Sequence, residues 1–544
     1  MGEARRRRRV GLWAWAAVSG IVSAAVFLAV AEALALLFGA GGSPILAVGG
    51  FVIDIVPQPF KEFAIATFGE YDKLALIAGL ALAVVIASAI AGILQAVRPP
   101  LGVIALAVAG VLSVAAIVTR TGATVLVAVP AVAGTVAGAL LLASLGQHVR
   151  GWQDTASAPA DPAADAPSAP AVPPASVPEN PAAPRSPAAM NRRAFFRTTA
   201  IAGASAVLIG IGARIVSATT SSIAAVRQAL SLPAPRSKVT IPGGAELDIP
   251  GISPLITPNA DFYRVDTALT VPAVDPSTWR LVVDGMVDQR VDIGFDDLVA
   301  MGLDEYAVTM TCVSNEVGGS LLGNAIWLGV PVRDVLALAG PQPGADMVLS
   351  RSVDGFTAST PLEALTDDGL DAILAVGMNG EPLPLEHGFP VRMVVPGLYG
   401  YVSATKWITE LKVTTFDADE AYWTPRGYSA KAPIKLSSRI DTPTSGAPVK
   451  TGKVAVAGVA WAQPVGVERV EVNIDDAGWR PATLSTAIND DTWVQWFVEW
   501  DAAPGTHFLS VRAVDKRGTT QVEERAPIAP DGSTGWQRIL VTVQ

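Results

Sequence analysis

The sequence predicts two different halves, a bundle of four membrane-spanning helices and then a globular α+β region that ends in a β-sandwich. Three observations support this division. Hydrophobic residues make up 51% of the 544 residues and charged residues only 16%, which is typical of a protein partly in lipid. The long apolar segments all precede residue 150. After residue 230 they give way to short alternating runs with frequent glycine and proline.

The N-terminal region contains four apolar segments, each long enough to cross a hydrocarbon core of about 30 Å as a helix. They are apolar on all sides, whereas a surface helix of a soluble domain has a polar face. Residues 1–150 are therefore expected to form a transmembrane bundle. The segments run approximately from Val10 to Phe38, Leu74 to Val97, Leu101 to Thr119 and Ala123 to Leu145.

The arginines predict how this bundle is oriented. The run Arg5 to Arg9 directly precedes the first apolar segment, and Arg98 and Arg150 follow the second and the fourth, so all of them fall on one side. Basic residues are retained on the cytoplasmic side of a membrane. We therefore expect a multi-pass protein of the cell membrane with a cytoplasmic N-terminus.

Two further segments separate the halves. Residues 151–190 are mostly Ala, Pro, Ser and Asp, a composition that predicts an extended linker. Residues 191–218 begin with Asn191-Arg192-Arg193 and continue as a moderately apolar run, which resembles a twin-arginine export signal and also suits a fifth transmembrane helix. Both interpretations place the rest of the chain outside the cytoplasm. We expect an uncleaved anchor.

The globular half has a strand-rich α+β pattern. Short β-like runs surround Leu281, Ala307 and Val391, and short helices are expected at Phe295–Met301 and Val332–Leu338. After residue 431, alternating runs are separated by hairpin turns such as Asp475-Asp476-Ala477-Gly478, which predicts a sandwich of seven strands.

The composition argues against several kinds of site. Cys312 is the only cysteine, which excludes a disulfide, a Cys-rich iron–sulfur cluster and covalent c-type haem within these residues. His148 is the only histidine of the membrane half, so haem with two histidine ligands is not expected there. The net charge of −10 and the lack of a basic stripe give no indication of nucleic-acid binding.

The single cysteine has several explanations. A lone thiol is a packing residue, a nucleophile or a metal ligand, and a small buried hydrophobe is the commonest of these. Cys312 follows a β-like run and precedes a loop with Gly318 and Gly319. A thiolate held on a rigid turn would suit a metal that a cofactor already carries.

Four stretches of the globular half occur in a distinctive order. They are Asn259…Asp261-Phe262-Tyr263-Arg264, Thr311-Cys312…Asn315, Trp327-Leu328-Gly329-Val330-Pro331 and His387-Gly388-Phe389-Pro390-Val391-Arg392…Gly400…Lys406-Trp407. Together they resemble the sulfite oxidase family of molybdopterin-dependent oxidoreductases, in a membrane-anchored bacterial form. The resemblance extends from about Ile252 to the C-terminus. It implies a molybdopterin-binding catalytic domain over 231–430 and an immunoglobulin-like, dimerisation-type domain over 431–544.

The resemblance also implies a cofactor and its site. The cofactor is molybdenum on molybdopterin, with the Cys312 thiolate as a metal ligand, and the catalytic residues are Cys312, Tyr428 and Arg264. A phenol such as that of Tyr428 is able to donate a proton during oxygen-atom transfer, although an ordinary buried Tyr–Trp pair explains it equally well. Fixed cations and planar donors suit a pterin with a phosphate tail. The cofactor-binding residues implied are Asn259, Phe262, Tyr263, Arg264, Asp354, His387, Arg392, Gly400 and Lys406.

Two positions depart from the family pattern. Val317, preceded by Glu316, stands where sulfite-oxidising members have an arginine, and Asp266 stands where they often have a histidine. With this loss of positive charge an anion such as sulfite is expected to bind worse. A neutral sulfoxide or N-oxide suits Val317 better, and the loop is also similar to the catalytic subunit of the bacterial methionine-sulfoxide reductase system.

These observations lead to one expected function and two alternatives. We expect a membrane-anchored oxidoreductase that transfers an oxygen atom to or from a small sulfur or nitrogen oxide on the extracytoplasmic side. A sulfite dehydrogenase and a cofactor-free, membrane-tethered binding module are the alternatives. With neither haem nor an iron–sulfur cluster expected, electrons would pass to or from a separate carrier, namely a quinone, a haem protein or a soluble carrier. The resemblance also makes a homodimer one of the assemblies to consider.

Overall fold

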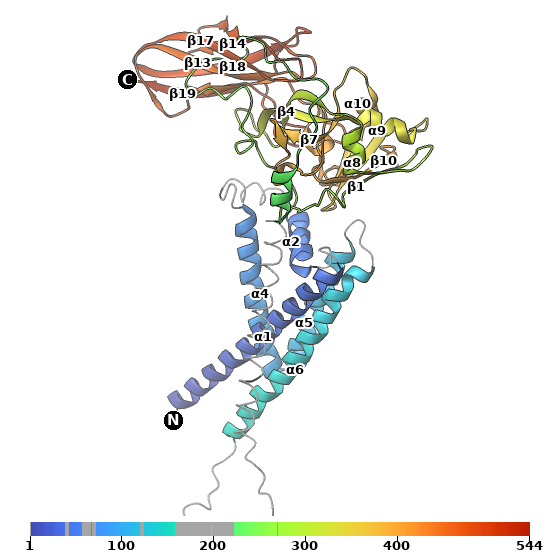
Figure 1. The fold of residues 1–544 in the computed structure, drawn as a ribbon. Helices are drawn as coiled ribbons and strands as arrows, with labels where there is room; N and C mark the ends of the chain where they lie inside the picture. The colour runs from blue at the N-terminus through green and yellow to red at the C-terminus, as the bar shows by residue number, and fades with distance from the viewer. Residues whose placement is uncertain are drawn as a thin grey trace, which may run out of the picture. The chain divides into compact units, whose positions relative to one another are not determined.

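The computed structural model describes residues 2–38, 43–56, 67, 72–119, 125–157, 197, 222–268 and 270–544. The chain divides into two compact units, Met1–Ala218 and Thr219–Gln544, coloured from blue to red along the chain in Figure 1. The predicted linker after Ser157 and the predicted export signal or fifth helix lie outside the described residues, apart from Arg197. The finer division into domains stays a prediction.

Four helices of the first unit are long and apolar enough to cross a membrane, within the part of the chain that the structure describes. This confirms the prediction of four apolar helices. The last one differs in its bounds, because the 3₁₀ helix η3 (Val125–Ala128) precedes it and the polar residues after Leu145 continue the helix. The helices are α1 (Gly2–Phe38), α4 (Asp72–Val97), α5 (Leu101–Val118) and α6 (Val129–Ser157).

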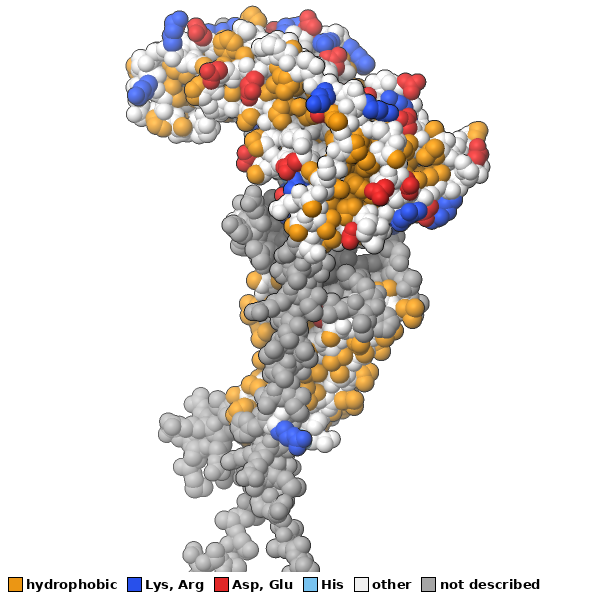
Figure 2. Space-filling view, in the orientation of Figure 1, with side chains coloured by type: hydrophobic (Ala, Val, Ile, Leu, Met, Phe, Trp, Pro, Cys, Tyr) orange, Lys and Arg blue, Asp and Glu red, His pale blue; other side chains and the backbone are white. Residues whose placement is uncertain are grey.

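Small residues let helices α1 and α4 approach closely. A Cβ atom added to Gly92 would lie 2.7 Å from the backbone nitrogen of Gly20, and one added to Gly20 would lie 2.7 Å from that of Gly92. Helices associate in this way in lipid, where burial of apolar surface contributes little. Large apolar side chains face outward instead, with Leu82 61% and Leu140 68% exposed. Figure 2 shows this hydrophobic surface on the described helices.

The short helix α2 (Pro44–Ile55) follows the first of these helices. At the start of α2, the Glu32 carboxylate of α1 accepts hydrogen bonds from Ser43 Oγ at 2.7 Å and from the backbone nitrogen of Ile45 at 3.3 Å. A carboxylate is favourable there because the first backbone N–H groups of a helix have no partner within it. Glu32 therefore has a structural explanation.

Two five-stranded sheets form the first part of the second unit. One has the order β2-β1-β10-β5-β6, in which only the β1–β10 pair is parallel. The other has the order β3-β4-β7-β8, with β9 paired to β7. Their bounds are β1 (Arg280–Gly285), β2 (Val291–Gly294), β3 (Asp304–Thr311), β4 (Leu322–Pro331), β5 (Met347–Ser352), β6 (Thr357–Pro361), β7 (Ile373–Met378), β8 (Glu381–Pro382), β9 (Arg392–Val394) and β10 (Ile408–Thr414).

Short helices connect these strands and cover the core. The helices expected at 295–301 and 332–338 are confirmed as α8 (Phe295–Ala300) and α9 (Val332–Ala339). Trp279, Leu336 and Leu411 are fully buried between the first sheet and these helices. This part also contains the helices α10 (Leu362–Thr366) and α11 (Gly400–Ser403), the 3₁₀ helices η5 (Leu385–His387) and η6 (Thr424–Arg426), and a helical segment over residues 222–229.

The C-terminal strands form two sheets around a common core. Val456 and Trp496 from one sheet and Val470, Val511 and Val541 from the other are buried in one cluster. Nine strands appear where seven were expected. Three of the nine have only two or three residues and are too short to show alternation. The orders are β11-β13-β17-β16 and β12-β19-β18-β14-β15. The strands are β11 (Ser437–Thr442), β12 (Pro448–Val449), β13 (Gly452–Trp461), β14 (Val467–Ile474), β15 (Trp479–Pro481), β16 (Thr483–Leu484), β17 (Val494–Ala502), β18 (Gly505–Asp515) and β19 (Gln537–Val543).

Candidate functional site

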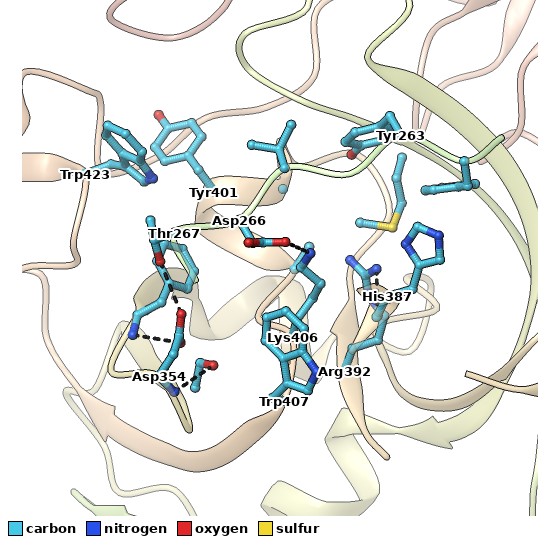
Figure 3. Close-up of a pocket in the computed structure, with 17 residues that line it drawn as sticks. Tyr263, Asp266, Thr267, Asp354, His387, Arg392, Tyr401, Lys406, Trp407 and Trp423 are labelled. Carbon is cyan, nitrogen blue, oxygen red and sulfur yellow. Dashed lines mark hydrogen bonds and ion pairs between the residues drawn. The ribbon is translucent and has the colours of Figure 1, made fainter. Parts of the chain in front are cut away.

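A pocket of the second unit contains about 780 Å³ of empty space, part of it open to solvent. Figure 3 shows that its walls come from several separate segments of the chain. The residues that line it are Phe262, Tyr263, Val265, Asp266, Thr267, Met310, Ser352, Asp354, Phe356, His387, Arg392, Gly400, Tyr401, Ala404, Lys406, Trp407 and Trp423.

The pocket brings together seven of the nine residues predicted to bind a cofactor. They come from the segment before β1, from the turn between β5 and β6, and from the stretch between η5 and β10. Asn259 and Arg264 do not line the pocket, nor do Cys312 and Tyr428. The seven are Phe262, Tyr263, Asp354, His387, Arg392, Gly400 and Lys406.

Arg392, the first residue of β9, is a buried cation on this wall, with 5% of the residue exposed. Its Nη1 donates to the carbonyl of His387 at 3.2 Å, its guanidinium lies 5.1 Å from the centre of the Trp327 ring, and its Nε is buried without a hydrogen-bond partner. Burial lowers the pKa of Arg392 to about 10. No carboxylate among the described residues forms an ion pair with it. A buried cation without an acidic partner lowers the stability of the fold, so this position fits an anionic ligand.

Lys406 is the second buried cation, and it has an acidic partner. Its Nζ donates to Asp266 Oδ2 at 2.7 Å and to the carbonyl of Glu386 at 3.0 Å. Arg264 Nε binds the same Asp266 oxygen at 2.9 Å, so Arg264 acts on the pocket through this carboxylate. Burial lowers the pKa of Lys406 to about 8, against the raising effect of Asp266. Figure 3 shows the Asp266–Lys406 pair beside Arg392.

His387 lies at the end of η5, between these cations and Asn259. Its Nε2 is 3.0 Å from the carbonyl oxygen of Asn259. Burial lowers the pKa of His387 to about 4, so the ring is neutral at pH 7. Because a carbonyl only accepts, the proton is assigned to Nε2 and Nδ1 is the acceptor. The side chain of Asn259 donates to Glu381 at 2.6 Å, which places Asn259 behind His387.

Glycine at position 388 permits this arrangement. Gly388 has φ of +112°, and a Cβ atom there would lie 3.0 Å from the Cβ of Arg392 and 3.1 Å from that of Lys406. A side chain would therefore meet both cationic residues and would also strain the backbone.

Asp354 lies on the opposite side of the pocket, in the turn between β5 and β6. Its carboxylate accepts from the backbone nitrogen of Phe356 at 3.3 Å and from Thr267 Oγ1 at 3.4 Å. The aromatic residues Phe356, Trp407 and Trp423 line the same pocket. This side is suited to stacking and hydrogen bonding rather than to charge neutralisation.

Cys312 lies just beyond the pocket wall, directly after β3. The strand's Met310 lines the pocket, and a Cβ atom on Gly400 would lie 4.0 Å from the Thr311 carbonyl oxygen. The cysteine is 8% exposed, and burial raises the pKa of its thiol. A metal ligand has to be a thiolate, so binding of a metal there would displace the proton.

Tyr428 lies behind the pocket wall, with 6% exposed. Its ring packs 5.5 Å from that of Tyr401 and 5.3 Å from that of Trp423, both of which line the pocket. This is the aromatic packing that the sequence allowed as an alternative, and a catalytic role of Tyr428 stays a prediction.

Several lining residues were not predicted from the sequence. Ser352, Phe356 and Tyr401 are close in sequence to predicted residues, so extending each motif by two residues would have included them. Asp266 was noticed only as a departure from the family pattern. Its partner Lys406 is 140 residues further along the chain, and the sequence gives no sign of that pairing.

The chain is similar to known proteins over its second unit. The family of oxidoreductase molybdopterin-binding domains matches residues 268–423. Mouse mitochondrial sulfite oxidase is 31% identical over 341 residues, which cover 53% of this chain and 62% of the mouse protein. The uncharacterized oxidoreductase YuiH of Bacillus subtilis is 35% identical over 154 residues, or 28% of this chain and 74% of YuiH.

Among solved structures, the sulfane dehydrogenase SoxCD from Paracoccus pantotrophus covers 56% of this chain and 86% of its own, with 23% identity and a TM-score of 0.48. The chain spans only about 62% of the mammalian sulfite oxidases it matches. The family match nevertheless includes most of the pocket-lining residues. On the grounds of the family match and of the identity with the sulfite oxidases and YuiH, the chain belongs to the sulfite oxidase family of molybdopterin-dependent oxidoreductases.

Proposed function

We propose that this chain is a membrane-anchored molybdenum–molybdopterin oxidoreductase. It transfers an oxygen atom to or from a small sulfur or nitrogen oxide on the extracytoplasmic side. The observation that carries the proposal is the pair of buried cations in the pocket, of which Lys406 is paired with a carboxylate and Arg392 is not. An anionic cofactor would supply the missing charge.

The proposed roles follow from the chemistry of each side chain. Arg392 and Lys406 would bind the anionic part of the cofactor, and the neutral His387 would offer Nδ1 to a hydrogen-bond donor of the pterin. Gly400 leaves its backbone open to a ligand, and Cys312 would bind the metal. The bound cofactor supplies a redox-active molybdenum that exchanges an oxygen atom and two electrons with the substrate. The remaining proposed cofactor contacts are Phe262, Tyr263 and Asp354. Asn259 and Arg264 do not line the pocket and would act on the cofactor through His387 and Asp266.

A neutral oxide is the proposed substrate class. The loop after Cys312 carries Glu316 and Val317, and Glu316 is exposed. Without a cation at position 317, the loop offers no attraction to an anion and a nearby acid would repel one. Sulfite is the second candidate, because the mammalian relatives are named sulfite oxidases. A cofactor-free binding module would have no reason to keep Arg392 buried and unpaired.

The proposal extends to location and partners. The four apolar helices would anchor the enzyme in the cell membrane, with residues 191–218 as an export signal or fifth helix. Electrons would pass to or from a separate carrier, either a quinone, a haem protein or a soluble carrier. The C-terminal sheets are proposed to be an immunoglobulin-like domain, which would allow a homodimer.

The cofactor is tested by its content in detergent-purified protein. We expect about one molybdenum and one pterin per chain in the wild type, and loss or a spectroscopic change of the metal in Cys312→Ser. Ser320→Ala, an exposed position of the same loop, is the control and should match the wild type. Wild-type protein without molybdenum, made in a host that synthesises the cofactor, would refute the proposal.

The substrate class is tested separately on loaded enzyme. Turnover of neutral sulfoxides or N-oxides with a reduced dye as electron donor should exceed turnover of sulfite with an oxidised dye as acceptor. Val317→Arg should restore binding of sulfite and lower its KM. Rapid sulfite oxidation by the wild type would favour the second candidate instead.

A further inference from the structure

We propose that the C-terminal sheets hold the loop of residues 312–321, here called the Cys312 loop, and that Arg439 of β11 is the positioning residue of this contact. The inference rests on the proposed metal-ligand role of Cys312. It gives the C-terminal part a function at the active site of its own chain, beyond any role in assembly. Arg439 lies outside every motif discussed above.

The Cys312 loop has few bonds of its own. The backbone nitrogen of Cys312 donates to the carbonyl of Leu321 at 2.9 Å, and that of Asn315 donates to the carbonyl of Cys312 at 3.0 Å. The side chain of Asn315 accepts from the backbone nitrogen of Leu321 at 2.9 Å. These bonds close the base of the loop. Residues 316–320 extend beyond them. Within this stretch the backbone nitrogen of Gly319 donates to the carbonyl of Glu316 at 2.8 Å, and further support comes from outside the loop.

Arg439 provides part of that support. Each of its three side-chain nitrogens has a partner, and one of them, Nη1, binds the loop. Nη1 donates to the carbonyl of Gly319 at 2.8 Å, Nη2 donates to Ser253 Oγ at 2.7 Å, and Nε donates to Asp441 Oδ1 at 2.6 Å. The ion pair is nearly buried, with 11% of the Arg439 side chain and 8% of the Asp441 side chain exposed. Asp441 in turn accepts from the backbone nitrogen of Ser253 at 2.9 Å. A planar guanidinium with several fixed partners leaves the Gly319 carbonyl little freedom.

Two other C-terminal residues contact the same loop. Ser533 Oγ donates to the carbonyl of Asn315 at 2.7 Å. The Gln537 side chain lies against Gly318, where an added Cβ atom would be 2.7 Å from Gln537 Nε2 and where φ is +82°. The oxygen of the same Gln537 side chain accepts from the backbone nitrogen of Ile440. The C-terminal part therefore contacts the loop at Asn315, Gly318 and Gly319.

These contacts bear on the thiol because the loop is continuous with it. Asn315 bonds both to the Cys312 carbonyl and to Ser533, so a displacement of the loop would be transmitted to the residue that carries the sulfur. Metal sites depend on such supporting contacts, since they fix the direction of the ligands. Arg439 itself does not touch the pocket, and it is therefore a positioning residue.

The test compares Arg439→Gln with Arg439→Lys and with the control Arg512→Gln. Arg512, like Arg439, pairs with a carboxylate on the C-terminal sheets, that of Glu471, but it contacts Trp479 and Trp536 rather than the Cys312 loop. In cofactor-free protein we expect amide hydrogen exchange in residues 312–321 to be about tenfold faster in Arg439→Gln, as the loss of one such hydrogen bond allows. Arg439→Lys should recover part of the protection, and Arg512→Gln should leave the loop unchanged.

The second readout is the electron paramagnetic resonance signal of the molybdenum in loaded protein, which should change in Arg439→Gln and stay the same in Arg512→Gln. Unchanged loop exchange and an unchanged signal in Arg439→Gln would overturn the proposal. If Arg439→Gln does not fold, Ser533→Ala decides, since faster exchange near Asn315 supports the proposal and wild-type exchange there overturns it. If the wild type binds no molybdenum but exchange in the Cys312 loop is still faster in Arg439→Gln, the proposed metal-ligand role of Cys312 is refuted and the positioning role of Arg439 is supported.

Discussion

At the scale of single residues, one wall of the pocket has two buried cations and, among the described residues, only one carboxylate that pairs with them. Arg392 and Lys406 are both buried on one wall, and Asp266 balances only one of them. Arg264 shares that same carboxylate from a more exposed position, with 38% of its side chain exposed. This wall of the pocket therefore has more positive than negative charge, while the Asp354 carboxylate lies on the opposite side. A buried cation without a paired carboxylate costs stability.

Replacing Arg392 separates stability from ligand binding. Arg392→Met removes a buried cation without an acidic partner, so the cofactor-free protein should melt at a higher temperature, while its pterin content should fall at least about tenfold for loss of a charge-assisted contact. Thermal melting and pterin analysis measure the two effects. Arg351→Met is the matched control, because Arg351 pairs with Glu410 at 2.6 Å and its loss should lower the melting temperature. A destabilised Arg392→Met protein that keeps its pterin would contradict the assignment.

Replacing Asp266 should change how pterin binding depends on pH. Burial lowers the pKa of Lys406 to about 8, with contributions from the neighbouring Arg392 and Arg264, and Asp266 opposes this shift. In Asp266→Asn, Lys406 should therefore lose its proton at a lower pH. Because a neutral lysine no longer attracts an anionic cofactor, dialysis at rising pH should release pterin from Asp266→Asn at a lower pH than from the wild type. Asp354→Asn, which does not contact Lys406, should keep the wild-type pH dependence. The same profile in all three proteins would show that Asp266 does not keep Lys406 charged.

At the scale of secondary-structure elements, the sequence was informative wherever composition or a long motif decides the outcome. The helices α4, α5, α8 and α9 were predicted close to their observed bounds, whereas α1 begins eight residues earlier and α6 ends twelve residues later than expected. The predicted binding residues between 387 and 406 all line the pocket. They are close in sequence, in η5, in β9 and in the segment that follows β9, so one motif covers them. Strands of two or three residues, such as β12 and β16, were missed because too few residues are present to show alternation. Contacts between distant segments, such as Asp266 with Lys406, leave no local pattern at all.

The pairing of α1 and α4 gives a prediction at this scale. Gly92→Leu would place a side chain against the backbone of α1, where a Cβ atom already lies 2.7 Å from the nitrogen of Gly20. Overpacking of this kind costs about 1–3 kcal/mol, so the bundle should unfold at a lower denaturant concentration in detergent. Gly79→Leu on the same helix is the control, because nothing lies within 4 Å of a Cβ atom there. Equal effects of both substitutions would mean that the two helices do not pack through these glycines.

At the scale of the whole second unit, the catalytic sheets and the C-terminal sheets are joined by polar contacts around β3. The backbone nitrogen of Thr309 donates to the carbonyl of Asp491 at 2.9 Å, and Trp493 donates from its backbone to Thr309 Oγ1 at 2.8 Å. Thr309 is three residues before Cys312, so the strand that leads to the proposed metal ligand also carries this junction. Together with Arg439, these contacts tie the proposed metal site to the C-terminal sheets from both ends of the Cys312 loop.

The half-buried Asp491, whose Oδ1 is buried, is expected to make this junction sensitive to pH. Its Oδ1 has no hydrogen-bond partner, and burial, with Asp371 and Asp490 nearby, raises its pKa to about 7. The unfolded chain releases this proton near pH 4, so between about pH 4 and 7 the folded state binds more protons and stability falls as the pH rises. Asp491→Asn should therefore melt at a higher temperature than the wild type at pH 8, and the difference should vanish near pH 4. Asp476→Asn, at an exposed ion pair with Arg538 that does not act on Asp491, should show no such dependence. A gap between Asp491→Asn and the wild type that stays constant from pH 4 to 8 would mean that the carboxyl group is not protonated in the folded state.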